Sequence, residues 1–555
     1  MTQTTNFHNY TFPFQTDQKY SKRVAYISME FALDQSLKIY SGGLGFLAGS
    51  HMRSAYALRQ NLIGVGMLWR YGYYDQERAS DNKMYVLFQQ KAYNFLQDTN
   101  IKFKVMVNDH EVWVKAFYLD PEVFKTAPMF FLSTDLPEND YLSQTITYKL
   151  YDSVVDTKIA QSIILGIGAG KLMDALNYSP DIYHLNEAHG LPVAFHLYSK
   201  YKDKEAVRKR MVFTTHTPVE AGNEKHDYAK LIDLSYFQQL TNEDVKNLTG
   251  FDSGVFEHTL AALRVSKIAN GVSKIHGEVA NKMWGKYEGI PEITSITNAQ
   301  KKSYWADEEL EKANQSRDRG ALILRKSALK KRLFEHVANQ TGKLFDPNIF
   351  TIVWARRFAE YKRPQLIIDD LNRFEEIFTE GKYPVQIIWA GKPYPKDEIA
   401  ISLFDELIDF CRDYPNVAIM TGYELTLSKM LKQGSDLWLN NPRIPNEASG
   451  TSGMTAMMNA SVNLSTYDGW IPEFIKDGVN GFVVPAVDYS NLSDAEEDKQ
   501  DRTNILDKLE KEIIPMYYDS PNKWYDLVLR GMQEIVPEFD SDRMADEYYT
   551  KMYKS

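Results

Sequence analysis

The segment NIFTIVWARRFAEYKRPQ (348–365) joins an apolar run to a turn with four basic residues. Its first part, NIFTIVWA (348–355), has the β-branched and aromatic composition of a buried strand. Similar runs follow at intervals and are separated by longer helix-type segments. They are VQIIWAG (385–391), NVAIMTG (416–422) and DLWLN (436–440). Short buried strands that alternate with helices predict an α/β fold with a parallel sheet.

The same alternation covers the first half of the chain. Its strand-type runs are VAYISME (24–30), LIGVGMLW (62–69), IKFKVMV (101–107), EVWVKAFYL (111–119), DIYHLN (181–186) and MVFTTH (211–216). A polar helical segment over 301–343 follows them. We predict two Rossmann-like domains, 1–300 and 301–530, that face a cleft at the carboxyl ends of their strands. A C-terminal helix is predicted over 531–555, and periodicity leaves open whether it packs back on the first domain.

The composition is that of an ordinary globular protein. Of 555 residues, 44% are hydrophobic and 25% are charged, and the net charge of −10 argues against a broad nucleic-acid surface. The single cysteine, Cys411, excludes a disulfide within the chain and fits a reducing compartment. We find no signal-peptide pattern and no apolar run long enough for a membrane span. We therefore expect a cytoplasmic protein without nucleic-acid or membrane partners.

The basic turn after the 348–355 run contains Arg356, Arg357, Lys362 and Arg363, and we expect a helical run from Gln365. Arginine matches phosphate oxygens with a planar fork, and lysine supplies a compact charge. Basic groups beside the free amides of a helix start indicate an anion site. The alternative is a solvated basic face.

The segment NEASGTSGM (446–454) places Glu447 before a turn rich in Gly, Ser and Thr. The backbone N–H groups of such a turn, over Gly450–Gly453, are suited to cradle a phosphate. The alternative is an ordinary helix start in which Thr451 or Ser452 is the N-cap. Local sequence favours this alternative.

Three further motifs place small or polar residues after strand-type runs. YSGGLGFLAG (40–49) is a glycine turn that allows close backbone approach to a ligand, but it is not a G-x-G-x-x-G fingerprint. HLNEAHG (184–190) and FTTHTP (213–218) supply His189 and His216. Each histidine either donates to a sugar hydroxyl or is a satisfied structural residue. No Cys/His cluster accompanies them, so we expect no metal site.

Taken together, these motifs resemble the α-glucan (glycogen/starch) phosphorylase family, in particular its short bacterial form. The resemblance runs in order through nearly the whole chain. It rests on AYISMEFALDQSLKIYSGGLGFLAGSHMRSA (25–55), GVGMLWRYGYYDQ (64–76), STDLPENDY (133–141), LGIGAGKLMDAL (165–176), HLNEAHG, TTHTPVEAG (214–222), VWARRFAEYKRP (353–364) and DLWLNNPRIPNEASGTSGM (436–454). It implies a glycosyltransferase-B fold and retaining transfer of glucose between an α-1,4-glucan end and phosphate.

The resemblance also implies roles for individual residues. Arg357 and Lys362 grip the substrate and cofactor phosphates, with Arg356 beside them. Glu447 holds glucose hydroxyls, and the region of His216 contacts the transferred glucose. The remaining implied positions are binding ones: Gly42 and Gly43 against the donor phosphate, His189 in the cleft, and Gly450, Thr451, Ser452 and Gly453 around the cofactor phosphate.

One departure from the family pattern concerns its cofactor. The family has a lysine directly after the methionine of the last motif, and that lysine forms a Schiff base with pyridoxal phosphate. This chain has Thr455 there, and a hydroxyl cannot form an imine. Further departures are Asp152-Ser153-Val154, Gln161-Ser162 and Ser50. We therefore expect no covalent pyridoxal phosphate.

A nucleotide sugar presents two adjacent phosphates next to a hexose, as the family's donor and cofactor do together. We therefore favour a pyridoxal-free retaining hexosyltransferase with a nucleotide-sugar donor, similar to glycogen synthase, and DGVNGFVVP (477–485) resembles nucleotide-sugar transferases. One alternative is a phosphorylase that holds pyridoxal phosphate noncovalently and uses a sugar phosphate. Another is an inactive glucan-binding or regulatory homologue. The expected acceptor is an α-glucan or oligosaccharide, and the family resemblance leaves a homodimer open.

Overall fold

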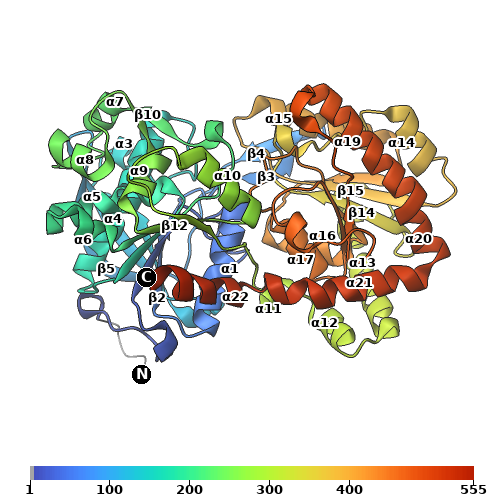
Figure 1. Cartoon of the computed structure of the whole chain (residues 1–555), viewed down its shortest axis with the longest axis horizontal. Coiled ribbons are helices and arrows are strands. Elements are labelled where there is room, and N and C mark those ends of the chain that lie inside the picture. Colours follow the sequence, from blue (N-terminus) through green and yellow to red (C-terminus); the bar gives the residue numbers. More distant parts are fainter. Residues whose placement is uncertain (1–5, 555) are drawn as a thin grey trace. The chain divides into compact units, whose positions relative to one another are not determined.

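A computed structural model describes residues 6–554 and has a mixed α/β architecture with two large sheets (Figure 1). The chain forms two compact units. The first unit contains residues up to Tyr74, Phe88–Asn298 and the residues from Ser541 on, and the second contains Asp75–Leu87 and Ala299–Asp540. The expected α/β class with parallel sheets is confirmed. The domain limits, the glycosyltransferase-B type and the cleft stay predictions.

The large sheet of the second unit is parallel throughout. Its strands are β14 (Phe350–Ala355), β15 (Val385–Ala390), β16 (Val417–Met420), β17 (Leu437–Asn440), β18 (Val462–Ser465) and β19 (Phe482–Val483). Their spatial order is β16-β15-β14-β17-β18-β19, which is the 3-2-1-4-5-6 order of doubly wound nucleotide-binding folds. The four strands that the sequence predicts in this half are all present.

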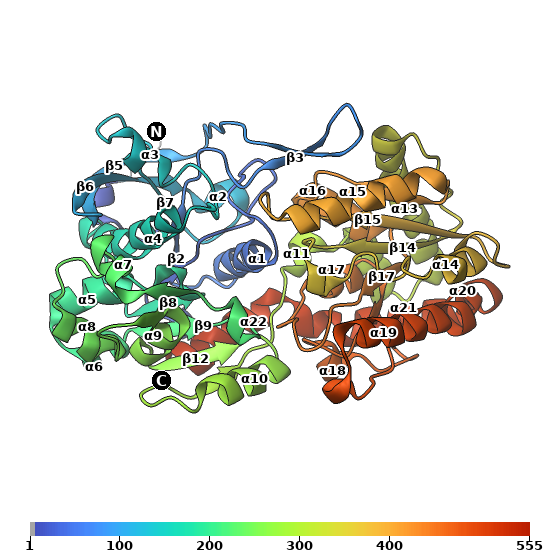
Figure 2. The ribbon, with the colours of Figure 1, turned by 90° about the horizontal axis from the view of Figure 1, so that it is seen from above.

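Helices cover both faces of this sheet, which is why its strands are continuous apolar runs. α16 packs on one face, where Leu431 joins Val353 and Ile388 in one core, and α15 packs on the other face, where Phe410 contacts the ring of Trp389. Figure 2 shows β14 and β15 between helices. Leu333 of α13 packs with Val353, Ile388 and Trp438 of the sheet in one buried core. The helices of the unit are α11 (Lys302–Trp305), α12 (Glu308–Gln315), α13 (Arg319–Thr341), α14 (Leu371–Phe378), α15 (Glu398–Asp413), α16 (Leu425–Gly434), α17 (Ser452–Met457), α18 (Ile471–Phe474), α19 (Asp494–Lys508), α20 (Ile514–Asp519) and α21 (Pro521–Glu534).

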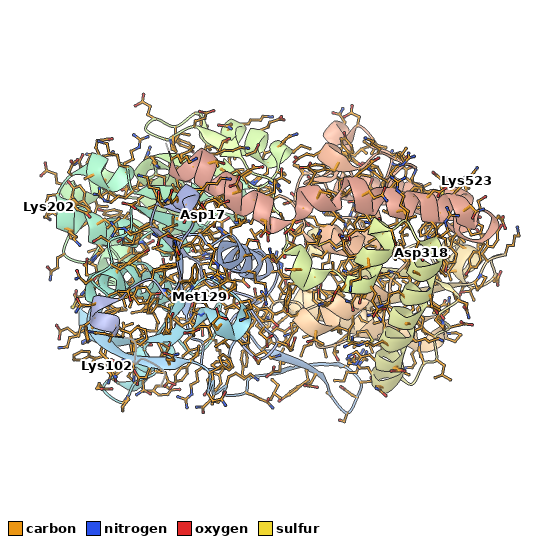
Figure 3. The ribbon with its side chains drawn as sticks, turned by 90° about the horizontal axis from the view of Figure 1, so that it is seen from below. Asp17, Lys102, Met129, Lys202, Asp318 and Lys523 are labelled. Atoms are coloured by element: carbon orange, nitrogen blue, oxygen red, sulfur yellow. The ribbon has the colours of Figure 1, made fainter. Side chains whose placement is uncertain are left out.

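The first unit is built on a nine-stranded sheet with the order β13-β12-β9-β8-β1-β2-β7-β6-β5. β6 runs antiparallel to both of its neighbours, β7 and the edge strand β5, and the other neighbouring strands of this sheet are parallel. The strands are β1 (Val24–Ile27), β2 (Leu62–Met67), β5 (Gln97–Val107), β6 (His110–Leu119), β7 (Met129–Ser133), β8 (Ile182–Asn186), β9 (Met211–Thr214), β12 (Ile268–Gly271) and β13 (Ile293–Ser295). Figure 3 shows Met129 of β7 in the interior of this unit, with Lys102 and Lys202 at its margin.

The helices of the first unit complete its layers. They are α1 (Gly43–Ala57), α2 (Pro121–Phe124), α3 (Tyr141–Thr145), α4 (Val155–Ala175), α5 (Val193–Tyr201), α6 (Lys204–Arg208), α7 (Tyr228–Asp233), α8 (Asn242–Thr249), α9 (His258–Val265), α10 (Lys274–Trp284) and α22 (Ser541–Glu547). β10 (Lys225–Asp227) and β11 (Val255–Glu257) form a small antiparallel sheet. α22 packs against α1, where the hydroxyl oxygens of Ser541 and Ser54 are 2.6 Å apart. The C-terminal residues thus join the first unit.

Two segments differ from the sequence-based expectation. The hairpin of β3 (Asp75–Arg78) and β4 (Met84–Leu87) belongs to the second unit, where the N–H of Met84 donates to Asp405 Oδ1 at 2.8 Å. The helical run expected from Gln365 is wrong, because α14 begins only at Leu371. Pro364 lacks an N–H group, and Arg363 before it has a φ of 52°, so the chain turns instead of continuing the short 3-10 helix η5 (Glu360–Lys362).

Among residues 6–554, no helix has the length and apolar character needed to cross a membrane.

Candidate functional site

The predicted cationic residues of the second unit follow the two strands at which its strand order reverses. β14 and β17 are neighbours in the sheet, yet their next strands in sequence lie on opposite sides. In open α/β sheets, ligands bind outside the carboxyl ends of the strands at such a point. The segment 356–363 follows β14, and the segment 441–453 follows β17. The topology therefore brings two of the predicted motifs to one edge of the sheet.

Lys362, Arg356 and Glu447 form a buried ionic cluster at this edge. The Lys362 ammonium group contacts Glu447 Oε2, and Arg356 Nη1 lies 3.7 Å from the same oxygen. The side chains of Lys362 and Arg356 are only 10% and 7% exposed. Arg357 is exposed, so the guanidinium group beside Glu447 is that of Arg356.

The electrostatics of the cluster favour an anion. Burial, together with the charges of Arg356 and Arg357, holds the pKa of Lys362 well below its usual range. Burial also lowers the pKa of Arg356 to about 10. The buried Nε of Arg356 has no hydrogen-bond partner within the part of the chain that the structure describes. Because two cationic side chains share the one carboxylate of Glu447, and the charge of Arg357 also acts on Lys362, a phosphate-bearing ligand fits this edge.

The turn after Glu447 leads into α17. Thr451 occupies the N-cap position but makes no side-chain capping bond, so a Thr451 side-chain cap is not what begins this helix. The Ser452 hydroxyl accepts a hydrogen bond from Trp438 Nε1 at 3.3 Å. A Cβ at Gly453 would lie 2.3 Å from Asn463 Oδ1, so this glycine is required by packing. Gly450 has a φ of 74°, where glycine is favoured.

The first unit has a corresponding reversal of strand order at β1, which lies between β2 and β8. Its switch point is the junction of β1 and β8. Glu30 follows β1, and Glu187 and His189 follow β8. His216 follows the adjacent strand β9. The predicted residues of this unit therefore also gather at the carboxyl edge of a parallel sheet.

Glu30 holds the glycine turn from within the unit. Its carboxylate accepts hydrogen bonds from the backbone N–H groups of Ser41 at 2.6 Å and Gly42 at 3.1 Å, and from the Tyr151 hydroxyl at 2.9 Å. The Gly42 amide is thus already engaged by a carboxylate. A Cβ at Gly42 or Gly43 would meet nothing within 4 Å, so packing does not require glycine there. The open surface suits close approach of a ligand.

The histidines of this edge differ in their contacts. His216 Nε2 bonds Asn186 Oδ1 at 2.7 Å, and burial lowers the pKa of His216 to about 3, so its ring is neutral. The buried Nδ1 of His189 has no partner among the described residues, while its carbonyl oxygen accepts from the Ser162 hydroxyl at 2.6 Å. His216 therefore fits the role of a satisfied structural histidine better than His189 does.

Glu187 is a site candidate that the sequence analysis missed. Its side chain accepts the backbone N–H of His216 and, at 3.2 Å, the hydroxyl of Thr217. Burial raises the pKa of this carboxyl group. Its backbone has a φ of 68° and a ψ of 170°, a conformation that residues other than glycine rarely adopt. Such backbone strain clusters at functional sites. A strained backbone leaves no signal in a single sequence.

Comparison with known proteins now identifies the family. The family described as carbohydrate phosphorylase matches residues 291–482. Maltodextrin phosphorylase of Thermococcus litoralis is 32% identical over 96% of this chain and 71% of its own length. Glycogen phosphorylase of Aquifex aeolicus is 30% identical over 97% of this chain and 87% of its own length. The chain belongs to the carbohydrate phosphorylase family.

A third relative is more similar than these two. An uncharacterized protein of Methanocaldococcus jannaschii is 46% identical over 96% of this chain and 100% of its own length. The match supports a short form of the family, as the sequence motifs predict. This carbohydrate phosphorylase homologue is accordingly a phosphorylase-like glycosyltransferase, and that level of the prediction is confirmed.

Within the carbohydrate phosphorylase family, the position of Thr455 decides whether a Schiff-base cofactor fits. Thr455 is 1% exposed, and its hydroxyl donates to the carbonyl oxygen of Ser452 at 3.0 Å. The lysine that precedes Thr455 in sequence, Lys432, contacts the Ser428 hydroxyl at 2.9 Å and lies 4.0 Å from the ring centre of Trp305. Thr455 offers a buried hydroxyl where a pyridoxal aldehyde needs an amine, so the site does not fit this cofactor as a Schiff base. Over residues 6–554, no group of three or more His, Cys, Asp or Glu is placed to hold a metal ion.

Proposed function

We propose that this member of the carbohydrate phosphorylase family is a retaining hexosyltransferase that works without Schiff-base pyridoxal phosphate. It moves glucose to or from an α-1,4-glucan and takes a nucleotide sugar as donor. The observation that carries the proposal is the buried cluster of Lys362, Arg356 and Glu447, which is intact while Thr455 has replaced the amine. Loss of function alone would not preserve such a costly cluster of buried charges.

The chemistry of the donor follows from the charges of this cluster. When the glycosidic bond to the donor breaks, negative charge develops on the leaving diphosphate. Preorganised cations stabilise such a leaving group without reorganisation, and Lys362, Arg356 and Arg357 are positioned at one edge for this role. The Glu447 carboxylate then has its remaining acceptor sites for sugar hydroxyls. The 3-2-1-4-5-6 strand order supports a glycosyltransferase-B assignment.

A second candidate is supported by the names of the relatives. Several of them are glycogen or maltodextrin phosphorylases. In this candidate the protein binds pyridoxal phosphate noncovalently in contact with the same cations and transfers glucose to inorganic phosphate. The two candidates share the cation cluster and differ in which second phosphoryl group occupies it.

The decisive experiment is calorimetric titration of the purified protein with UDP-, ADP- and GDP-glucose and with glucose 1-phosphate. We expect one nucleotide sugar to bind and to extend a maltooligosaccharide, detected as lengthened product by mass spectrometry. The variant Lys362→Met should abolish both readouts. The matched control is Lys476→Met, because Lys476 is a 71% exposed lysine of the same unit. If no nucleotide binds, the donor proposal is wrong.

A parallel assay separates the remaining alternatives. The protein is incubated with pyridoxal phosphate, and release of glucose 1-phosphate from maltooligosaccharide and phosphate is measured. Phosphorolysis that depends on added cofactor would establish the second candidate. Glucan binding without turnover under either condition would identify an inactive homologue.

A further inference from the structure

Three consecutive residues, Asp468–Trp470, contact the turn that carries Glu447. The carboxylate of Asp468 accepts the backbone N–H of Glu447 at 2.8 Å. The indole N–H of Trp470 donates to the carbonyl oxygen of Gly450 at 3.0 Å. Between them, Gly469 lies so close to the turn that a Cβ would be 2.5 Å from the Ser449 carbonyl oxygen. Each residue of this segment thus meets a different part of the turn.

Asp468 is the charged member of this segment, and both of its oxygens are used. Oδ2 accepts the Glu447 N–H, and Oδ1 accepts the N–H of Gly469 at 2.8 Å. The residue is 4% exposed. A buried carboxylate is costly unless its hydrogen bonds are made. The contacts of Asp468 therefore indicate that it serves to hold this backbone, since no surface role is open to it.

Fixing the backbone of Glu447 also restricts its side chain. The Glu447 carboxylate reaches Lys362 from this peptide, and the two residues come from segments that follow different strands. We propose that Asp468, with Gly469 and Trp470, is a positioning residue that holds Glu447 against Lys362 and so orients the sugar hydroxyls that Glu447 binds. This inference rests on the proposed function of Glu447 as a sugar-binding residue.

The charge state of Asp468 adds a pH dependence to this positioning. Only the ionised carboxylate offers an acceptor to each N–H group, because protonation converts one oxygen into a donor. Burial raises the pKa of Asp468 to about 7, and the nearby ammonium group of Lys362 partly opposes this rise. Among the described residues, the charge that acts on Asp468 is that of Lys362 on η5, and Glu447 in the turn meets it through its backbone N–H. The hold on Glu447 therefore weakens as the pH falls through neutrality.

Hydrogen–deuterium exchange with mass spectrometry tests the positioning directly on the full chain. In Asp468→Asn, one amide oxygen replaces two carboxylate oxygens, so at pH 8 we expect the peptide over 446–453 to exchange at least about tenfold faster than in the wild type. The matched control is Asp346→Asn. Asp346 also accepts a backbone N–H, from Asn348 at 2.8 Å, but it lies in an exposed turn before β14. This control should leave 446–453 unchanged.

The pH profile provides a readout that a purely structural residue would not move. The protection of 446–453, corrected for intrinsic exchange, should fall in the wild type between pH 8 and pH 6 and stay flat in Asp468→Asn. If Asp468→Asn does not fold, Trp470→Phe keeps the aromatic ring beside Phe539 and removes only the donor to Gly450. It should increase exchange over the same peptide.

Transfer activity links the positioning to function. Asp468→Asn should lower kcat at least about tenfold, and Asp346→Asn should stay within twofold of the wild type. Unchanged exchange over 446–453 in both Asp468→Asn and Trp470→Phe would overturn the inference, whatever the activity. The variants could show increased exchange while the wild type itself transfers no sugar. That result would refute the proposed function but would leave the positioning of Glu447 by Asp468 standing.

Discussion

The carboxylate of Glu447 contacts the ammonium group of Lys362, although 85 residues separate the two in the chain. They meet because the segments after β14 and β17 share the carboxyl edge of one parallel sheet. Arg356 stands 3.7 Å from the same carboxylate oxygen. The cations of this edge are therefore engaged by a protein carboxylate, and an incoming phosphate-bearing ligand has to share them with it.

Ligand binding at this edge should be accompanied by proton uptake. Burial and the charges of Arg356 and Arg357 lower the pKa of Lys362, and a bound anion favours the ammonium form and raises that pKa again. The affinity therefore falls as the pH rises through the pKa of the free enzyme. Calorimetry in buffers of different ionisation enthalpy, with a nucleotide sugar or with sulfate, measures this uptake.

The variant Lys362→Arg is the control for this proton uptake, because a guanidinium group stays charged at all accessible pH values. It should bind the anion without taking up a proton. Heats that are identical in all buffers for the wild type would contradict the assignment.

Removal of Arg357 should slow transfer strongly. Although exposed, Arg357 adds its charge to the cluster around Lys362. By analogy with other electrostatic donors, Arg357→Ala should lower kcat/KM by about 100-fold or more, which corresponds to about 3 kcal/mol. Arg412→Ala, at an exposed arginine that pairs with Asp409, is the control and should be neutral. Turnover of Arg357→Ala within a few-fold of the wild type would exclude this role.

Glu30→Gln should destabilise the first unit. The glutamine amide nitrogen would face either the N–H groups of Ser41 and Gly42, which both donate to Oε2, or the Tyr151 hydroxyl, which donates to Oε1. Leaving one buried donor unpaired costs about 1–3 kcal/mol in the free energy of unfolding. Chemical denaturation measures this loss. Glu122→Gln, at an exposed carboxylate, should change stability by less than about 0.5 kcal/mol, and equal effects of the two variants would refute the role of Glu30.

Thr455→Lys tests whether the site is still built for an aldehyde cofactor. Because Thr455 is 1% exposed, a lysine there buries an amine, and we expect a loss of more than about 2 kcal/mol in stability. Thr455→Val, which loses the hydrogen bonds from the hydroxyl to the carbonyl oxygens of Ser452 and Thr451, should cost about 1 kcal/mol. A Thr455→Lys protein that is as stable as the wild type and forms a borohydride-reducible adduct with pyridoxal phosphate would count against a pyridoxal-free enzyme.

Strand positions are predictable here because parallel strands buried on both faces are continuous apolar runs. The runs over 348–355 and 385–391 became β14 and β15 within two residues at each end. The helix expected from Gln365 failed because the effect of Pro364 outweighs the periodicity that follows it. The hairpin over 75–87 lacks any sequence feature that assigns it to the second unit, since such assignment depends on distant contacts with Asp405.

The amino-acid sequence by itself determined the chemistry that is possible at single positions: a hydroxyl at Thr455, and cations at Arg356, Arg357 and Lys362. Only the tertiary structure decided which of these groups meet. Asp468 bonds the Glu447 amide, and His216 bonds Asn186, because each pair comes from the ends of two strands that are neighbours in a sheet. Such hydrogen bonds depend on which strands are neighbours in the sheet, and local residue patterns do not predict that strand order.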